Sequence, residues 1–170
     1  MNEATDDEKI LQLLKTDDPK NIELAFQLCV GLEEEYGEAV AKALRKQVLY
    51  CIRNGLETEY FENLQSLSLN SKGLKVFPTK LLQLRKLRGL QMWRNQLKEI
   101  PSEISQLTQL EALSLQYNQL TTLPEEISQL TKLRDVYLYG NKFSQEEKHR
   151  IIRLLPENCD IRFKRMYNDT

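Results

Sequence analysis

Few side chains in this 170-residue chain have the types and spacing that catalysis or metal binding requires. The single histidine, His149, lies in a stretch that we predict to be an exposed helix, and we interpret it as a surface residue. The three cysteines lack Cys-x-x-Cys or Cys/His spacing, which argues against the common zinc motifs. No glycine-rich phosphate loop and no Ser/His/Asp set is present. We therefore predict no catalytic residue, no metal and no cofactor, and we classify the chain as a non-enzyme.

Recognition of another macromolecule is the chemistry that the side chains favour. Four aromatic residues and two arginines recur at related positions of a repeated pattern, and the only tryptophan of the chain is among them. Trp, Tyr and Arg are the residue types that dominate binding hot spots. The candidate binding residues are Gln91, Trp93, Arg94, Gln116, Tyr117, Arg134, Tyr137 and Tyr139. Aromatic residues also favour strands for reasons unrelated to binding, which is the alternative interpretation of this group.

The repeated pattern is L-x-x-L-x-L-x-x-N-x-L. It begins at Leu64, Leu87, Leu110 and Leu133, so successive units are 23 residues apart. Between these segments, Ile100–Leu107 and Leu123–Leu130 repeat a second motif with a proline in its second position. A fixed period of this length indicates a solenoid in which each coil stacks on the next.

Each L-x-L segment predicts a short strand with one buried face, because alternate side chains of a strand point to opposite sides. A single coil cannot bury its leucines alone, but stacked coils bury them from both sides. Full burial of one leucine contributes about 1.5–3 kcal/mol. The predicted inward residues are Leu67, Leu69, Leu90, Met92, Leu113, Leu115, Val136 and Leu138.

An asparagine follows the strand in three of the units: Asn95, Asn118 and Asn141. An amide side chain both donates and accepts hydrogen bonds, so it can pair with the backbone groups of a turn. We predict that the three asparagines form a structural ladder through the stacked coils. In the first unit, Lys72 occupies this position instead of asparagine. Such departures from the repeat pattern are common in terminal coils.

On these residues, the region from 64 to 143 resembles leucine-rich repeats of the 23-residue bacterial kind, and also the Ras-group leucine-rich repeats of plants and animals. The resemblance implies an α/β solenoid with a parallel sheet of about five strands on its concave face. It further implies a non-catalytic module that binds another protein through that face. Two alternatives stay open: a regulatory or targeting module acting with a separate GTPase or ligase partner, and a homo-oligomerising structural protein.

The residues between the inward leucines are expected to form columns on the outer side of the sheet. One column holds Gln91 and Tyr137, the next holds Trp93, Gln116 and Tyr139, and Arg94 and Tyr117 run beside them. Continuing the same step of 23 residues predicts a fifth strand over 159–163. It places Asp160 beside Tyr137, Arg162 beside Tyr139, and Cys159 in a core position.

The chain divides into a helical N-terminal cap over 1–60, repeats over 61–143, and a C-terminal helix-strand cap with a tail over 144–170. Thr5 and Glu8 form a capping box before a first helix, and Asp18-Pro19 begins a second over about 19–30. A third helix is predicted over about 36–54, ended by Gly55. Leu24, Leu28 and Leu32 widen the apolar surface of the second helix, which predicts burial on two sides. A small recognition domain is the alternative to a cap.

The overall charge is −1, but it is uneven along the chain. Residues 1–60 carry 7 Lys/Arg and 13 Asp/Glu, whereas residues 61–170 carry 17 and 12. We expect no nucleic-acid partner, because the basic residues are not clustered. No secretory signal and no apolar stretch of membrane-spanning length is seen, and the cysteines fall at apolar positions typical of reduced thiols. We therefore predict a cytoplasmic protein, a monomer or weak homo-oligomer, with another protein as its partner.

Overall fold

The computed structural model describes residues 4–16, 18–33 and 35–164. Two compact units make up the chain, Met1–Phe61 and Glu62–Thr170. The first contains helices only, and the second contains the repeats together with the C-terminal helix and strand. Within the described residues, no helix combines the length and apolar character needed to cross a membrane.

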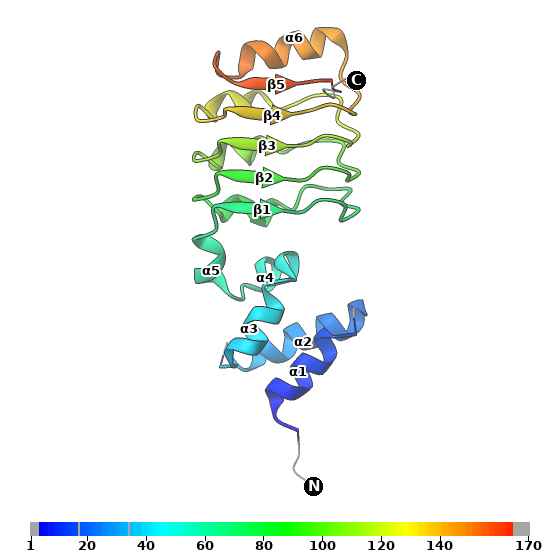
Figure 1. Cartoon of the computed structure of the whole chain (residues 1–170), viewed down its shortest axis with the longest axis vertical. Helices are drawn as coiled ribbons and strands as arrows, with labels where there is room; N and C mark the ends of the chain where they lie inside the picture. The colour runs from blue at the N-terminus through cyan, green and yellow to red at the C-terminus, as the bar shows by residue number, and fades with distance from the viewer. Residues whose placement is uncertain (1–3, 17, 34, 165–170) are drawn as a thin grey trace, which may run out of the picture. The chain divides into compact units, whose positions relative to one another are not determined.

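The repeat unit is built on a parallel sheet of five strands in the order β1-β2-β3-β4-β5 (Figure 1). In register, Leu67 lies beside Leu90, Leu90 beside Leu113, and Leu113 beside Val136. All eight predicted inward residues are buried, none more than 4% exposed. The prediction of a leucine-rich repeat solenoid with about five parallel strands is therefore confirmed. The strands are β1 (Ser66–Ser68), β2 (Gly89–Gln91), β3 (Ala112–Ser114), β4 (Asp135–Tyr137) and β5 (Asp160–Arg162).

Short 3-10 helices form the back of the coils: η1 (Thr79–Gln83), η2 (Ser102–Gln106) and η3 (Glu125–Gln129). A proline precedes each of them, with φ between −75° and −65°. Proline fixes this φ and has no N–H that would need a partner at the start of a helix. One residue of each back segment, such as Ile104 or Ile127, is fully buried. The core therefore lies between the strands and the 3-10 helices.

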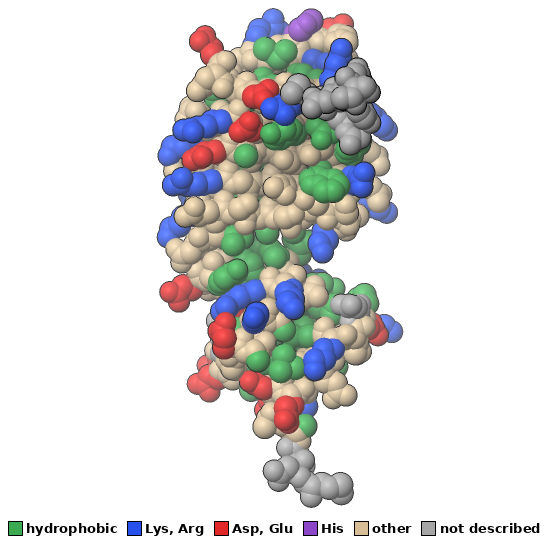
Figure 2. Space-filling view, in the orientation of Figure 1, with side chains coloured by type: hydrophobic (Ala, Val, Ile, Leu, Met, Phe, Trp, Pro, Cys, Tyr) green, Lys and Arg blue, Asp and Glu red, His purple; other side chains and the backbone are tan. Residues whose placement is uncertain are grey.

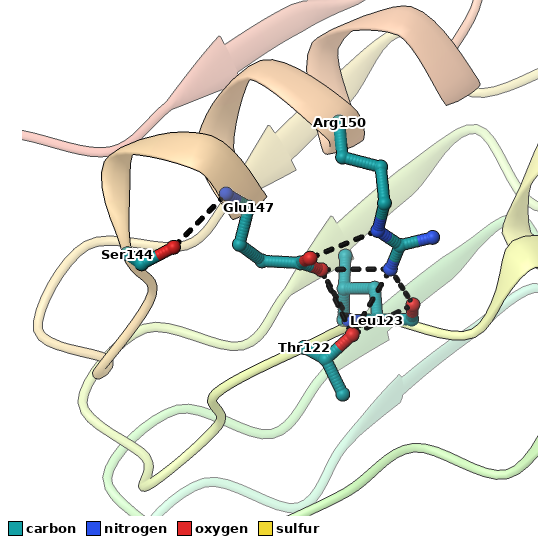
Figure 3. Close-up of polar contacts among 5 residues, drawn as sticks. All are labelled: Thr122, Leu123, Ser144, Glu147 and Arg150. Atoms are coloured by element: carbon teal, nitrogen blue, oxygen red, sulfur yellow. Dashed lines mark hydrogen bonds and ion pairs between the residues drawn. The ribbon is translucent and has the colours of Figure 1, made fainter.

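The C-terminal helix α6 (Gln145–Leu154) is joined to the last complete repeat by hydrogen bonds from Glu147 and Arg150, which pair with each other within the helix (Figure 3). The Ser144 hydroxyl caps the helix by accepting from the Glu147 N–H at 3.1 Å. The Glu147 carboxylate accepts from the Arg150 guanidinium and, at 2.9 Å, from the Thr122 hydroxyl. Arg150 also donates to the Leu123 carbonyl. The hydrogen bond from Arg150 is the main cause that lowers the pKa of Glu147 to about 2.

The predicted register of the fifth strand is wrong by two residues. Val136 pairs with Ile161 and Tyr137 with Arg162, so the last step is 25 residues instead of 23. The reason is local: the ten-residue helix α6 replaces the five-residue 3-10 helix of the other coils. Cys159 consequently lies just before β5 and is half-buried instead of occupying a core strand position. Phe163 instead packs edge-on against Phe143, with ring centroids 6.1 Å apart.

The helical unit contains α1 (Asp6–Leu14), α2 (Pro19–Gly31), α3 (Glu38–Leu44) and α4 (Val48–Asn54), and α5 (Thr58–Glu62) follows at its end. The capping box is confirmed: Thr5 and Glu8 exchange hydrogen bonds of 3.3 and 2.9 Å. Asp18 caps α2 by accepting from the Lys20 N–H at 2.9 Å, also as predicted. The core of the unit is apolar: Ile10, Ile22, Phe26, Cys29, Val40, Leu44 and Cys51 are buried.

The single helix predicted over 36–54 is wrong, because the chain breaks between α3 and α4. The Leu44 carbonyl accepts from the Gln47 N–H at 2.7 Å and from the Cys51 thiol at 3.1 Å. A continuous helix would need that carbonyl for the N–H of Val48, four residues ahead. Gly55 ends α4 in the left-handed conformation, with φ +70°, as predicted.

Burial of α2 on two sides is also wrong: Leu24 and Leu28 are 46% and 40% exposed. Helix α5 is not among the predicted elements. A buried carboxylate, Glu57, binds the Arg45 guanidinium at 2.6 Å and the Tyr36 hydroxyl at 3.0 Å in this unit. That the helices cap the repeats stays a prediction.

Candidate functional site

The turns that follow the strands are held by the three asparagines. The Asn118 amide donates to the carbonyls of Met92 and Leu115 at 2.9 and 3.0 Å, and its oxygen accepts from the Leu97 N–H at 3.0 Å. Asn95 and Asn141 make the corresponding bonds one unit before and one unit after. Each asparagine therefore joins its own turn to the preceding coil. Removal of one would leave backbone groups unpaired, at a cost of about 1–3 kcal/mol each.

The residue just before this asparagine position adopts the left-handed conformation in every unit. Ser71, Arg94 and Tyr117 have φ of +55° to +56°, and Gly140 has +73°. For a residue other than glycine, this conformation costs roughly 1–2 kcal/mol. It makes the turn sharp, and both Arg94 and Tyr117 have exposed side chains there. The coil geometry thus presents these two side chains at the carboxyl-terminal ends of the strands.

Aromatic rings and one guanidinium group are stacked on one another at these turns. The Arg94 guanidinium lies 5.2 Å from the ring centroid of Trp93 and 5.7 Å from that of Tyr117. The rings of Tyr117 and Tyr139 meet edge to face, with centroids 5.3 Å apart. Exposed cation–π contacts contribute about 0.5–1 kcal/mol each, and aromatic pairs about 0.5–1.5. These contacts fix the positions of four large side chains before any partner arrives.

The absence of a side chain at Gly140 leaves room for the Tyr117 ring. A Cβ at position 140 would lie 2.6 Å from Cδ1 of Tyr117, which no side chain could tolerate without a shift. The sequence analysis did not recognise this role. The signal was available, since Gly140 takes the position of Ser71, Arg94 and Tyr117 in the other units.

A hollow of about 250 Å³, here called the aromatic hollow, is lined by Trp93, Arg94, Gln116, Tyr117 and Tyr139. Figure 2, which looks onto the strands, shows hydrophobic side chains gathered over the carboxyl-terminal ends of the middle strands. The Gln116 side-chain oxygen is buried in the molecule and accepts no hydrogen bond from the described residues. Buried polar atoms are normally paired, so this acceptor is an unused binding group.

The other predicted residues lie outside the hollow. Tyr137 is half-buried on β4, where the Arg162 guanidinium lies 5.1 Å from its ring centroid. The two-residue register error concealed this contact from the sequence analysis. Gln91 is exposed on β2 and accepts from the Asn70 amide at 3.1 Å.

Arg134 is not brought to the aromatic residues. It precedes β4 and lines a second hollow of about 320 Å³ together with Glu111 and Lys132. In Figure 2, Lys and Arg side chains follow one another along this margin, where the strands begin. The two ends of the strands thus differ in chemistry: charged where the strands begin, and aromatic where they end.

Outside this face, two cysteine thiols have raised pKa values. Burial raises the pKa of Cys29 to about 11 and that of Cys159 to about 11, so both thiols are protonated near neutral pH. His149 is exposed on α6. In the part of the chain that the structure describes, no group of three or more His, Cys, Asp or Glu side chains could hold a metal ion.

Comparison with known proteins supports the interpretation of the repeats. The leucine rich repeat family model matches residues 62–120 and 85–143. No curated protein sequence matches the chain. A solved leucine-rich repeat protein of Leptospira interrogans is similar at 44% identity with a TM-score of 0.55; the match covers 59% of this chain and 26% of that protein. The chain thus spans about a quarter of the length of that relative.

Two internalins of Listeria monocytogenes are also similar. For inlF, the identity is 26% and the TM-score 0.48, over 58% of this chain and 31% of that one. For internalin C2, the identity is 17% and the TM-score 0.46, over 68% and 55%. With the match over residues 62–143, the similar Leptospira protein and the five-stranded parallel sheet, this region of the chain consists of leucine-rich repeats of the bacterial type.

Proposed function

We propose that this chain is a non-catalytic interaction module that binds another protein through the strand face, the outward side of β1–β5. The observation that carries the proposal is the aromatic hollow, to which three successive repeats contribute Trp93, Gln116, Tyr117 and Tyr139. Large aromatic side chains held in place by their neighbours match the anchors that contribute most to protein interfaces. Their rigidity also reduces the entropy lost on binding.

The family supports this proposal in outline, since leucine-rich repeats serve widely as interaction modules, although a fold alone does not dictate function. The raised pKa values of the Cys29 and Cys159 thiols disfavour these two residues as nucleophiles. The strand face carries the carboxylates of Glu111, Asp135 and Asp160. Those of Glu111 and Asp160 already pair with Arg88 and Arg162. This arrangement resembles a recognition surface more than a catalytic cleft.

The test is a quantitative pull-down from cell lysate with three baits: the native chain, Trp93→Ala/Tyr139→Ala, and Val76→Ala/Ile152→Ala. The last pair is the matched control, because both residues are exposed hydrophobics outside the strand face. Thermal melts of all three baits establish that each is folded. We expect a partner that is captured by the native and control baits and lost with the Trp93/Tyr139 bait.

Equal capture of the partner by all three baits would contradict a role for the strand face. The mass of the native chain in solution and the identity of a captured partner distinguish the two alternative functions. A dimer that dissociates on Trp93→Ala/Tyr139→Ala would favour the homo-oligomeric alternative. A captured GTPase or ubiquitin ligase would favour the regulatory alternative.

A further inference from the structure

The Arg94 guanidinium in the aromatic hollow has no counter-charge among the described residues. The Arg94 guanidinium lies over two rings, and no described carboxylate is within ion-pair distance of it. Two other arginines of the strand face behave differently: Arg88 pairs with Glu111 at 3.5 Å and Arg162 with Asp160 at 2.6 Å. An arginine held rigidly by aromatic stacking and lacking an anion is suited to bind a carboxylate in bidentate fashion.

The surroundings of Arg94 have the same sign of charge. The segments that leave the strands, residues 70–73, 93–96, 116–119 and 139–142, contain Lys72, Arg94 and Lys142 and no Asp or Glu. All three cationic side chains are exposed. This margin of the strand face therefore carries a positive field, which favours approach of an acidic partner and disfavours a basic one.

The floor of the hollow adds a second requirement. The buried Gln116 oxygen has no donor among the described residues, so a bound group that reaches it when the side chain turns outward can satisfy it with an N–H or O–H. The volume of about 250 Å³ is below the range of about 300–1,000 Å³ typical of pockets for whole small molecules. An extended peptide meets both conditions, because it brings a backbone N–H and inserts one side chain at a time.

We propose that the aromatic hollow receives an acidic, extended segment of the partner protein. In this arrangement a carboxylate of the segment pairs with Arg94, a backbone N–H of the segment donates to the Gln116 oxygen, and the rings of Trp93, Tyr117 and Tyr139 cover the flanking side chains. This inference rests on the proposed function and specifies the chemistry of the partner.

The probe is a random peptide library displayed on phage and selected on the full native chain, with prior depletion on Trp93→Ala/Tyr139→Ala. The selected peptides are sequenced and synthesised, and their affinities are measured by fluorescence anisotropy at low and high salt. We expect enrichment of Asp and Glu and weaker binding at high salt. Arg94→Gln should weaken binding about tenfold or more, and Gln116→Met about two- to tenfold.

Arg134→Gln is the matched control, since it removes an exposed arginine from the other end of the strands and should change affinity less than about twofold. Thermal melts of each variant establish that it is folded. Peptides that require Trp93 and Tyr139 but show no acidic enrichment, or are insensitive to Arg94→Gln, would overturn the acidic segment and leave the strand face as the binding site. Selection of no peptide that depends on Trp93 and Tyr139 would overturn a linear segment as occupant, and the pull-down would then decide the proposed function independently.

Discussion

The repeat unit and the helical unit differ in how often each contact is made. In the repeat unit the same contact recurs from coil to coil, as in the row of Leu67, Leu90, Leu113 and Val136 across neighbouring strands. In the helical unit each contact is made once, as in the pairing of Glu57 with Arg45. Because of this repetition, the structure of the repeat unit can be predicted from its period, and neighbouring coils depend on one another for stability.

The largest effect is expected where the repetition is strongest. Leu113 is fully buried and pairs with Leu90 on one side and Val136 on the other. Leu113→Ala should lower the free energy of unfolding by about 2–5 kcal/mol, because it removes apolar contacts and leaves a cavity between coils. Chemical denaturation of the full chain measures this difference.

Trp93→Ala is the control for that measurement, because its side chain is half-buried on the strand face instead of lying between coils. Its free energy of unfolding should fall by only about 1 kcal/mol, through loss of the contact with Arg94 and of the partial burial of the ring. If Leu113→Ala cost less than about 1 kcal/mol, the coils would not depend on one another in the way that stacking requires.

A smaller effect is expected where the repeat unit makes a contact only once. Glu147 accepts directly from the Thr122 hydroxyl and the Leu123 N–H, and its partner Arg150 donates to the Leu123 carbonyl. Among the described residues, no other coil has this arrangement. The pKa of Glu147 is lowered from 4.5 to about 2 in the folded chain. The carboxylate therefore contributes stability fully above about pH 4.5, and this contribution is lost as the pH falls through about 2.

Glu147→Gln should lower the free energy of unfolding by about 1–3 kcal/mol at neutral pH. The difference from the native chain should shrink between about pH 4.5 and about pH 2, and denaturant unfolding over this range measures it. Glu99→Gln, which changes an exposed carboxylate, is the control. A difference that is the same at both ends of the range would show that the ionised form of Glu147 does not stabilise α6.

The structure of the repeat unit could be predicted well from the sequence, because each position of the repeat occurs in four copies. An inward residue such as Met92 was identified by its register, although its type differs from leucine. The prediction failed at the fifth strand, where one unique helix, α6, changed the step from 23 to 25 residues. In the helical unit, the caps at Thr5 and Asp18 were predicted from local chemistry. The break after Leu44, where the Gln47 N–H and the Cys51 thiol donate to the Leu44 carbonyl, was not, because the apolar spacing of the sequence continues through it.

The candidate site shows the same division. The sequence placed Trp93, Gln116 and Tyr139 in one column, and the structure brings them into one hollow. It could not show that Arg94 stacks between two rings or that the Gln116 oxygen lacks a donor, because these features depend on side-chain conformations. Column position therefore predicts which residues face outward, and side-chain packing decides what they can bind.

The smallest effect on stability is expected in the helical unit, at Leu24, which the sequence analysis predicted to be buried. Leu24 is 46% exposed on α2, so Leu24→Ala should change the free energy of unfolding by less than about 1 kcal/mol. Ala25→Gly in the same helix is the positive control, since Ala25 is fully buried and glycine disfavours a helix interior by about 1 kcal/mol. Chemical denaturation followed by circular dichroism measures both variants. A loss of about 2 kcal/mol or more for Leu24→Ala would mean that another surface covers this face of α2 in solution, and the helical unit would then resemble the repeats in burying its leucines on two sides.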